Sequence, residues 1–430
     1  MRGALLFLPL LLAACGKLSA PPPGPPQNLT QVWGLLLEDP LTRPGSFTPA
    51  NFNTGGVVPD EAGNLYILTR SVPYNWREER DDVVLMKVSP DGTYRGVVVT
   101  DEPLRRWILE QGFQDCDLDV YENNSLAYQG GLLYATFSPR REANMCYTLF
   151  GGNGAVIVAY EAQSLTRVGY WVLIPGQGAL AGVRKLHAPF IAPHPEGGVL
   201  GLIPLQKEGE DGGSFYVLRL PRNGPPEVRP PEGEASGFVG GFVGVQGGEG
   251  YVTAHNGALH RFGWDLGDVR WRLDLQTGPG PFPPVLTGAL DLEGDTLVWG
   301  DTIVPILGQP FPDARQYSVF LLRLDPTGRP RWVQYLDQFF PGMYIVRHLG
   351  DRGEILYASG DMFFLDPATG EVRRRLMVWE SDPRGVERQV QNYLAVVPTE
   401  DGLFGVARAR PVIEGNLTYR YAATRWRWVP

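Results

Sequence analysis

Short apolar runs separated by turn-forming residues make up almost the whole chain beyond residue 30. The runs are rich in Val, Leu, Tyr, Phe and Trp, and Gly, Pro, Asn or Asp stands between them. This is the pattern of β-strands joined by turns. No long stretch has the spacing of an amphipathic helix, so the pattern predicts an all-β protein.

Paired runs recur along the chain at an irregular but visible period. The first strand of each pair is marked by one residue, giving the series Tyr66, Tyr134, Leu200, Tyr251, Leu297, Tyr357 and Leu403. Neighbouring members of this series are 46 to 68 residues apart by residue number. A four-stranded propeller blade takes about 40 to 50 residues, and the wider gaps contain insertions. The spacing predicts a single β-propeller with seven blades, or eight if one wide gap hides a degenerate blade.

The two ends of this region predict how the ring closes. Residues 31–37 read Gln-Val-Trp-Gly-Leu-Leu-Leu, and the C-terminal residues 419–429 alternate between two faces, one of them strongly apolar. A propeller keeps open sheet edges unless one strand from each end of the chain completes the same blade. We therefore expect the N-terminal segment to pair with the C-terminal strand in the last blade.

Composition and charge narrow the classes of protein and partner. The chain has 54 Gly and 39 Pro among 430 residues, and 43% of its residues are hydrophobic, which argues against both a helical protein and wholesale disorder. The formal net charge is -9 at pH 7. An acidic balance repels nucleic-acid phosphates and anionic lipid head groups, so we expect no nucleic-acid partner.

The N-terminus predicts export. Arg2 precedes an apolar run over residues 4–12, which is too short to span a bilayer as a helix. Leu-Ala-Ala-Cys-Gly at residues 12–16 resembles the lipobox of bacterial lipoproteins, and the resemblance implies a signal peptide over residues 1–14 and lipidation of Cys15. An ordinary secretory signal with a chance cysteine is the alternative.

The segment after Cys15 predicts a tether. Residues 21–26 read Pro-Pro-Pro-Gly-Pro-Pro, which forms neither a helix nor a sheet ladder and adopts an extended conformation. We expect residues 15–28 to be a lipid-anchored tether and residues 29–430 to be the propeller domain. Lipid alone then holds the chain at the membrane of the cell envelope.

Two stretches in the C-terminal half resemble the repeats of pyrroloquinoline-quinone-like propellers. Residues 324–332 and 365–372 carry an Asp followed by a Thr-Gly turn, and Trp271 and Trp332 fit the Trp that opens the next strand in those repeats. A lipobox joined to such a propeller is similar to the eight-bladed propeller lipoproteins of outer-membrane protein assembly. The resemblance implies a scaffold that faces the periplasm from the outer membrane of a two-membrane host.

Two further cysteines, Cys116 and Cys146, follow the lipobox. Exported proteins are in oxidising surroundings, so these residues predict a disulfide rather than catalytic thiols. Because strands one and three of a blade are too far apart for a bridge, we expect both cysteines in loops at the same end of one blade.

No catalytic or cofactor-binding motif is complete. The chain has neither the Gly-x-Ser-x-Gly elbow of serine hydrolases nor a phosphate-binding Gly-x-x-x-x-Gly-Lys loop, and it lacks the adjacent cysteines of quinoprotein dehydrogenases. The run over residues 237–244 holds four glycines that could bring strands close together near the channel. We expect no cofactor.

Candidate metal ligands also lack completed spacing. Carboxylates at residues 115, 117 and 119 would share one strand face and could bind calcium. The segment lacks the Gly and the terminal Glu of an EF-hand loop, so a solvated acidic edge is the favoured interpretation. His187 with His194, and His255 with His260, have no third zinc ligand nearby. The run Arg373-Arg374-Arg375 predicts a solvated outer edge.

These features favour a non-catalytic scaffold that binds another envelope protein, with Arg140 and Arg141 in a charged insertion as the first candidate contact. One alternative is an exported propeller enzyme that acts on a carbohydrate or small metabolite with acids from different blades. Another is a sensor that binds a ligand in the channel. Convergent carboxylates at a channel mouth would favour the enzyme.

Overall fold

The structure is a computed structural model, and it describes the parts of the chain from which the fold is built. These are residues 28–37, 56–71, 82–111, 114–119, 125–140, 154–209, 214–230, 239–255, 257–264, 266, 269–275, 284–311, 318–336, 345–377, 379–381, 387–411 and 420–429.

Antiparallel four-stranded groups account for most of the described residues. The first group contains β2 (Gly56–Pro59), β3 (Leu65–Ser71), β4 (Asp82–Val88) and β5 (Tyr94–Val98). The second contains β7 (Leu126–Gln129), β8 (Leu132–Arg140), β9 (Ala155–Glu161) and β10 (Arg167–Leu173), with β6 (Gln114–Asp119) on the far end of β8. The third contains β12 (Phe190–Pro193), β13 (Val199–Lys207), β14 (Ser214–Leu220) and β15 (Glu227–Arg229), with β11 (Val183–Leu186) on β13.

Four more groups follow along the chain. The fourth contains β16 (Val239–Gln246), β17 (Tyr251–His255), β18 (Ala258–Phe262) and β19 (Val269–Asp274), and the fifth contains β20 (Val285–Leu292), β21 (Asp295–Thr302), β22 (Ser318–Leu324) and β23 (Pro330–Leu336). The sixth contains β24 (Ile345–Leu349), β25 (Glu354–Ala358), β26 (Asp361–Leu365) and β27 (Val372–Met377). The last contains β29 (Glu387–Thr399), β30 (Gly402–Pro411), β31 (Arg420–Val429) and β1 (Asn28–Leu36), with β28 (Trp379–Ser381) on β29.

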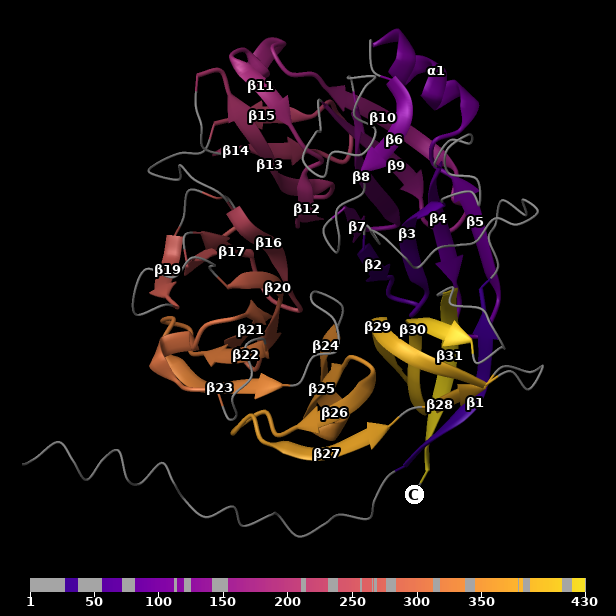
Figure 1. Cartoon of the computed structure of the whole chain (residues 1–430), viewed down its shortest axis with the longest axis vertical. Helices are drawn as coiled ribbons and strands as arrows, with labels where there is room; N and C mark the ends of the chain where they lie inside the picture. The colour runs from indigo at the N-terminus through magenta and orange to yellow at the C-terminus, as the bar shows by residue number, and fades with distance from the viewer. Residues whose placement is uncertain are drawn as a thin grey trace, which may run out of the picture.

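The groups are arranged as a propeller around a central axis (Figure 1). The innermost strands are β2, β7, β12, β16, β20, β24 and β29, and each contacts the next around the complete ring. In the part of the chain that the structure describes, the groups number seven, consistent with seven blades. The all-β propeller that the sequence predicts is therefore confirmed. All seven marker residues from Tyr66 to Leu403 lie on the second strand of their blade.

The expected closure of the ring is also confirmed. Strand β1 pairs antiparallel with β31 from Asn28 opposite Val429 to Leu36 opposite Ala422. On its other side β31 pairs with β30. The last blade therefore combines strands from both ends of the chain, which removes an open edge from the ring.

Helical structure is confined to connections between strands. Helix α1 (Glu102–Glu110) lies between β5 and β6, and three 3-10 turns are η1 (Gly178–Leu180), η2 (Ile306–Gly308) and η3 (Gly350–Arg352). Among the described residues, no helix combines the length and apolar character needed to cross a bilayer.

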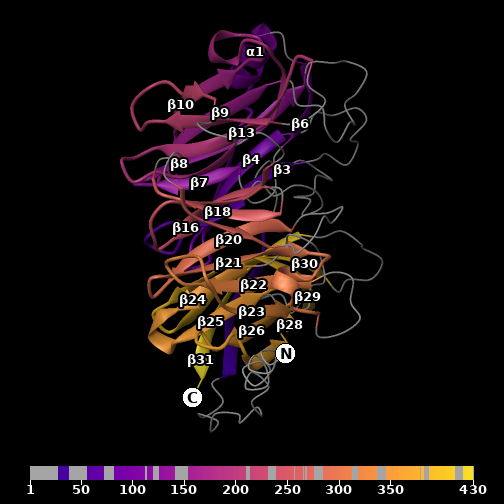
Figure 2. The same cartoon turned by 90° about the vertical axis from the view of Figure 1, so that its left-hand side faces the viewer.

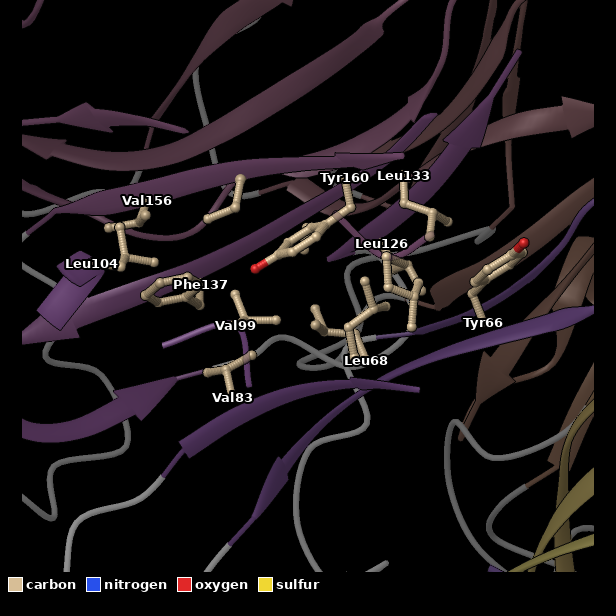
Figure 3. Close-up of a cluster of buried hydrophobic side chains, with 14 of the residues drawn as sticks. Tyr66, Leu68, Val83, Val99, Leu104, Leu126, Leu133, Phe137, Val156 and Tyr160 are labelled. Carbon is tan, nitrogen blue, oxygen red and sulfur yellow. The ribbon is translucent and has the colours of Figure 1, made fainter. Parts of the chain in front are cut away.

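The core consists of apolar layers between neighbouring blades. Figure 3 shows one such layer, in which Leu68 and Val83 of the first blade lie on one side and Leu133, Phe137 and Val156 of the second blade on the other. All of these side chains are buried. Burial of each such side chain stabilises the fold by about 1.5–3 kcal/mol, so radial stacking supplies the core that a lone four-stranded sheet lacks.

Tryptophans of outer strands pack on glycine turns of the next blade. A Cβ on Gly328 would lie 2.8 Å from the Trp271 ring, and a Cβ on Gly370 would lie 2.7 Å from the Trp332 ring. The Trp332 indole N–H also donates to the Pro367 carbonyl, at 3.0 Å. The Trp and the Thr-Gly turn that recur in the sequence therefore form a contact between neighbouring blades.

Replacing Gly370 by Ala should destabilise the ring more than replacing Gly182. The two glycines have nearly equal φ angles of +75° and +76°, but nothing lies within 4 Å of a Cβ on Gly182. Both variants incur the left-handed backbone cost of about 1–2 kcal/mol, and overpacking against Trp332 adds about 1–3 kcal/mol to Gly370→Ala. Urea unfolding of the two variants measures the difference, and equal midpoints would contradict this packing role.

An arginine on the third strand holds a turn in several blades. Arg219 donates to the Gly197 carbonyl, Arg261 to the carbonyls of Tyr251 and Phe262, and Arg323 to Asp295 and the Pro367 carbonyl of the next blade. In the last blade Arg425 donates to Asp401 at 3.0 Å. The repeated Arg therefore holds the turn between the first and second strands.

The Asp401 interaction should make stability depend on pH in the acid range. Hydrogen bonds from Arg425 and Arg427 lower the pKa of Asp401 to about 2, so its contribution is complete above its unfolded pKa of ~4 and disappears as pH falls through about 2. The difference in melting temperature between wild type and Asp401→Asn should be constant above pH ~5 and shrink towards pH ~2. A difference that stays constant down to pH ~2 would contradict this assignment.

Candidate functional site

The two faces of the ring differ in the connections they carry. At one face, the first strand of each blade turns into the second, and in the first six blades the third turns into the fourth, through short turns of at most six residues, such as residues 221–226. At the other face, longer segments join successive blades, such as residues 99–113, and join the second and third strands of the first, second, fifth and last blades, such as residues 303–317. In the fourth and sixth blades the second and third strands are joined by only two residues, 256–257 and 359–360. Figure 2 shows the short turns on the left edge of the molecule. We call these the short-turn face and the loop-bearing face.

One of the two candidate contact residues, Arg140, lies at the end of its strand on the loop-bearing face. Arg140 is the last residue of β8, and its backbone pairs with Gln114 of β6. Its side chain and the whole of Arg141 lie outside the described residues.

The structure describes the backbone of one of the two cysteines that are predicted to form a disulfide. Cys116 lies within strand β6 rather than in a loop, so that part of the expectation is wrong. Strand β6 pairs with the far end of β8, where Leu118 is opposite Pro139. This pairing puts Cys116 beside the start of the segment that carries Cys146. Cys146 itself and the Cys116 side chain lie outside the described residues, so the bond stays a prediction.

Helix α1 is the main feature that the sequence pattern missed. Asp101 caps it by accepting from the Leu104 backbone N–H at 3.1 Å, and Pro103 stands in its first turn. Arg105 from the helix pairs with Asp82 of β4 at 2.6 Å, with both side chains 7% exposed. The capping residue, the proline and the apolar spacing of residues 104, 107 and 108 are a helix signal that could have been recognised.

Exposed apolar side chains gather beside this helix on the outer rim of the second blade. Val168 and Tyr170 of β10 are 58% and 41% exposed, and Leu109 of α1 is 45% exposed. The Trp107 ring meets the Tyr170 ring edge-on, with centroids 4.8 Å apart. The second blade therefore carries both an aromatic rim and the charged insertion of the loop-bearing face.

Titratable side chains converge at one place on the short-turn face, between the first and second blades. The Tyr66 hydroxyl donates to Asp60 at 3.0 Å, and the Tyr128 hydroxyl donates to Glu61. The two tyrosine rings are stacked with centroids 6.2 Å apart. Asp60 also accepts from the Asn64 side chain at 2.8 Å. The four residues Asp60, Glu61, Tyr66 and Tyr128 form what we call the tyrosine–carboxylate cluster.

The protonation of this cluster limits its chemistry. Burial, together with the hydrogen bond to Asp60, raises the pKa of Tyr66 above its usual range. Burial and the hydrogen bond to Glu61 raise the pKa of Tyr128 to about 12. Both phenols are therefore protonated donors at neutral pH, and neither is a ready nucleophile. The arrangement is that of a contact which fixes the turn of the first blade against the second.

Candidate metal ligands are dispersed among the described residues. His187 lies three residues before β12 and His194 directly follows it, so the strand holds the two side chains too far apart to bind one ion. His194 is 8% exposed beside Trp264, and burial and Arg219 lower its pKa. No group of three His, Cys, Asp or Glu side chains suited to a metal ion occurs in the described segments. The carboxylates at residues 115, 117 and 119 lie on β6, but their side chains are outside the described residues.

Two other features of the sequence have a structural role. Arg373, Arg374 and Arg375 lie on the outer strand β27, where Arg373 and Arg375 are exposed as expected. Each of the three also pairs with an acid, at 2.5, 2.8 and 2.6 Å respectively. The glycines of β16 allow close approach of strands, since a Cβ on Gly241 would lie 2.6 Å from the Leu286 carbonyl oxygen of β20. The expected close approach of strands is therefore confirmed at Gly241.

Comparison with known proteins found similarity in structure but not in sequence. No protein-family model matches the chain, and no curated protein matches its sequence. Among solved structures, a Trypanosoma rangeli sialidase is similar at 8% identity and TM-score 0.42, over 94% of this chain and 59% of the sialidase chain. The Dos1 propeller is similar at 8% identity and TM-score 0.45, over 87% and 77% of the two chains. BamB from Moraxella catarrhalis is similar at 12% identity and TM-score 0.41, over 93% and 100%.

Proposed function

We propose that this chain is a lipid-anchored protein of the cell envelope whose propeller is a non-catalytic scaffold for an envelope protein that docks on the loop-bearing face. The observation that carries the proposal is the contrast between the two faces. Turns on the short-turn face are fixed by arginine and tyrosine contacts, whereas the longer connections all leave the opposite face. Binding residues are typically found on loops that a rigid framework positions.

The direction of β1 supports this choice of face. Strand β31 begins after the connection from β30 on the loop-bearing face and ends at the short-turn face, and Asn28 of β1 lies opposite its end at Val429. The tether over residues 15–28 therefore joins the ring at the short-turn face. A lipid on Cys15 would turn that face towards the membrane and the loop-bearing face away from it.

The charge of the short-turn face favours a position at some distance from the lipid head groups. The short turns are rich in acids, including Asp60, Glu61, Glu249, Glu293 and Asp401. Anionic head groups repel such a surface. A tether of this length reaches about 40 Å if it is fully extended as polyproline II. The acidic face can thus stand clear of the lipid while confinement raises the local concentration of a membrane partner.

Anchoring is tested by replacing Cys15 with Ala. The wild-type chain should fractionate with membranes and resist extraction by high salt, because two or more acyl chains bind durably. The Cys15→Ala chain should be recovered in the soluble fraction as a folded propeller. Membrane association of the unlipidated variant would contradict the anchor.

The docking face is tested by charge reversal followed by crosslinking in membranes. Arg140→Glu with Arg141→Glu should weaken crosslinks to the envelope partner at least tenfold, corresponding to about 1.4 kcal/mol of binding. Arg329→Glu, an exposed arginine in a short turn of the fifth blade, is the matched control and should crosslink as the wild type does. Equal loss in both variants would contradict docking on the loop-bearing face. The sequence resemblance makes proteins of outer-membrane assembly the first partners to examine.

The tyrosine–carboxylate cluster gives the enzyme alternative a specific test. The purified chain should turn over none of a panel of glycosides, lactones and alcohols supplied with a quinone. Reproducible turnover that Glu61→Gln abolishes would replace the scaffold proposal with an enzyme whose site lies at the short-turn face.

A further inference from the structure

Arg347 is a basic side chain on the inner side of the ring. It is the middle residue of β24, the innermost strand of the sixth blade, and is half-buried between the buried residues Val346 and Leu349. Its Nη1 donates to the Gln246 side-chain oxygen, which comes from β16, the innermost strand of the fourth blade. The same nitrogen lies 3.3 Å from the Val346 carbonyl oxygen. Two blades that are not neighbours thus meet at this side chain.

The charge of Arg347 has no counter-ion among the described residues. Arginines elsewhere in the ring, such as Arg323, Arg374 and Arg425, pair with carboxylates. Burial alone lowers the pKa of Arg347 to about 10, so the guanidinium is still charged at pH 7. Because this half-buried charge has only amide oxygens as partners, an anion from the solvent would stabilise it.

The remaining polar atoms of this pair are all donors. The Gln246 oxygen is already engaged, which leaves the Gln246 amide nitrogen together with Nε and Nη2 of Arg347. A guanidinium edge beside an amide N–H matches two oxygens of one oxyanion, and charge-assisted hydrogen bonds of this kind are the stronger ones. We propose that Arg347 and Gln246 form a binding site for a small oxyanion, a carboxylate or a phosphate group, on the inner side of the propeller.

This site is separate from the proposed docking face and does not depend on the lipid anchor. Two calorimetric titrations of the full chain test the site directly, one with sodium acetate and one with sodium phosphate. Chloride keeps the ionic strength constant in both. We expect saturable binding of at least one anion. The anion that binds more tightly shows whether the site prefers a carboxylate or a phosphate group. Arg347→Gln should weaken that binding at least tenfold, and Arg347→Lys should recover only part of it because a lysine lacks the planar fork.

Arg184→Gln is the matched control. Arg184 of β11 also donates to a glutamine, Gln206 of β13, at 2.6 Å, but both residues belong to the third blade, so its replacement should leave anion binding unchanged. Gln246→Glu is the second variant, because it supplies Arg347 with an internal carboxylate. It should abolish anion binding and raise the melting temperature. The proposal is overturned if wild type binds neither anion, or if Arg347→Gln and Gln246→Glu both bind as the wild type does.

Discussion

Removal of residues 419–430 should abolish the cooperative unfolding of the whole ring. The deletion takes away β31, which pairs with β30 on one side and β1 on the other. It also removes the buried side chains Tyr421, Ala422, Ala423 and Trp426 from the last blade. Loss of a buried Trp alone costs about 3–5 kcal/mol, and a native domain has only about 5–15 kcal/mol in total.

The same deletion exposes strand edges that the intact ring covers. Strand β30 loses its outer neighbour and β1 loses the partner that joins it to the ring, so we expect a chain that aggregates and melts without a sharp transition. Deletion of Pro430 alone leaves β31 complete and is the control. Calorimetry of the two chains decides the matter, and a truncated chain that melts within a few degrees of the control would show that the ring does not need this closure.

The strand framework could be predicted from the sequence because it depends on local patterns that recur. Tyr66, Tyr134 and Tyr357 each follow a turn and open an apolar run, and all three lie on second strands of blades. Closure could be predicted because the C-terminal residues alternate with the period of a strand, and the apolar N-terminal run supplies a partner for it. A single apolar run predicts a strand only weakly, but the recurrence of the same turn and run along the chain predicts the propeller.

Features that join distant parts of the chain could not be predicted in this way. Asp82 of β4 and Arg105 of α1 form a buried ion pair. Arg347 of the sixth blade donates a hydrogen bond to Gln246 of the fourth blade. Nothing in the local pattern around Arg347 distinguishes it from Arg323, which pairs with Asp295. The apolar pattern reports which residues are buried, whereas the partner of a buried charge is set by how blades stack. The candidate anion site therefore became visible only in the structure.

Breaking the Asp82–Arg105 pair should destabilise the first two blades strongly. Arg105 donates to Asp82 at 2.6 Å and to the Thr100 carbonyl at 3.0 Å, and the Thr100 hydroxyl donates to Asp82 at 3.2 Å. Arg105→Met preserves most of the side-chain volume but leaves a buried carboxylate without the guanidinium. Removing one partner of a buried ion pair costs about 3–5 kcal/mol, which should appear as a large fall in the urea midpoint.

A second substitution separates loss of charge pairing from loss of packing. Asp82→Ala combined with Arg105→Met removes both charges, and apolar replacement of a complete buried pair is often close to neutral. The double variant should therefore be more stable than Arg105→Met alone, with a coupling of about 1–3 kcal/mol in the mutant cycle. Additive losses would instead mean that Arg105 stabilises α1 through its aliphatic contacts and its hydrogen bond to Thr100. The cycle thus decides whether this connection on the loop-bearing face is held to the ring by charge or by packing.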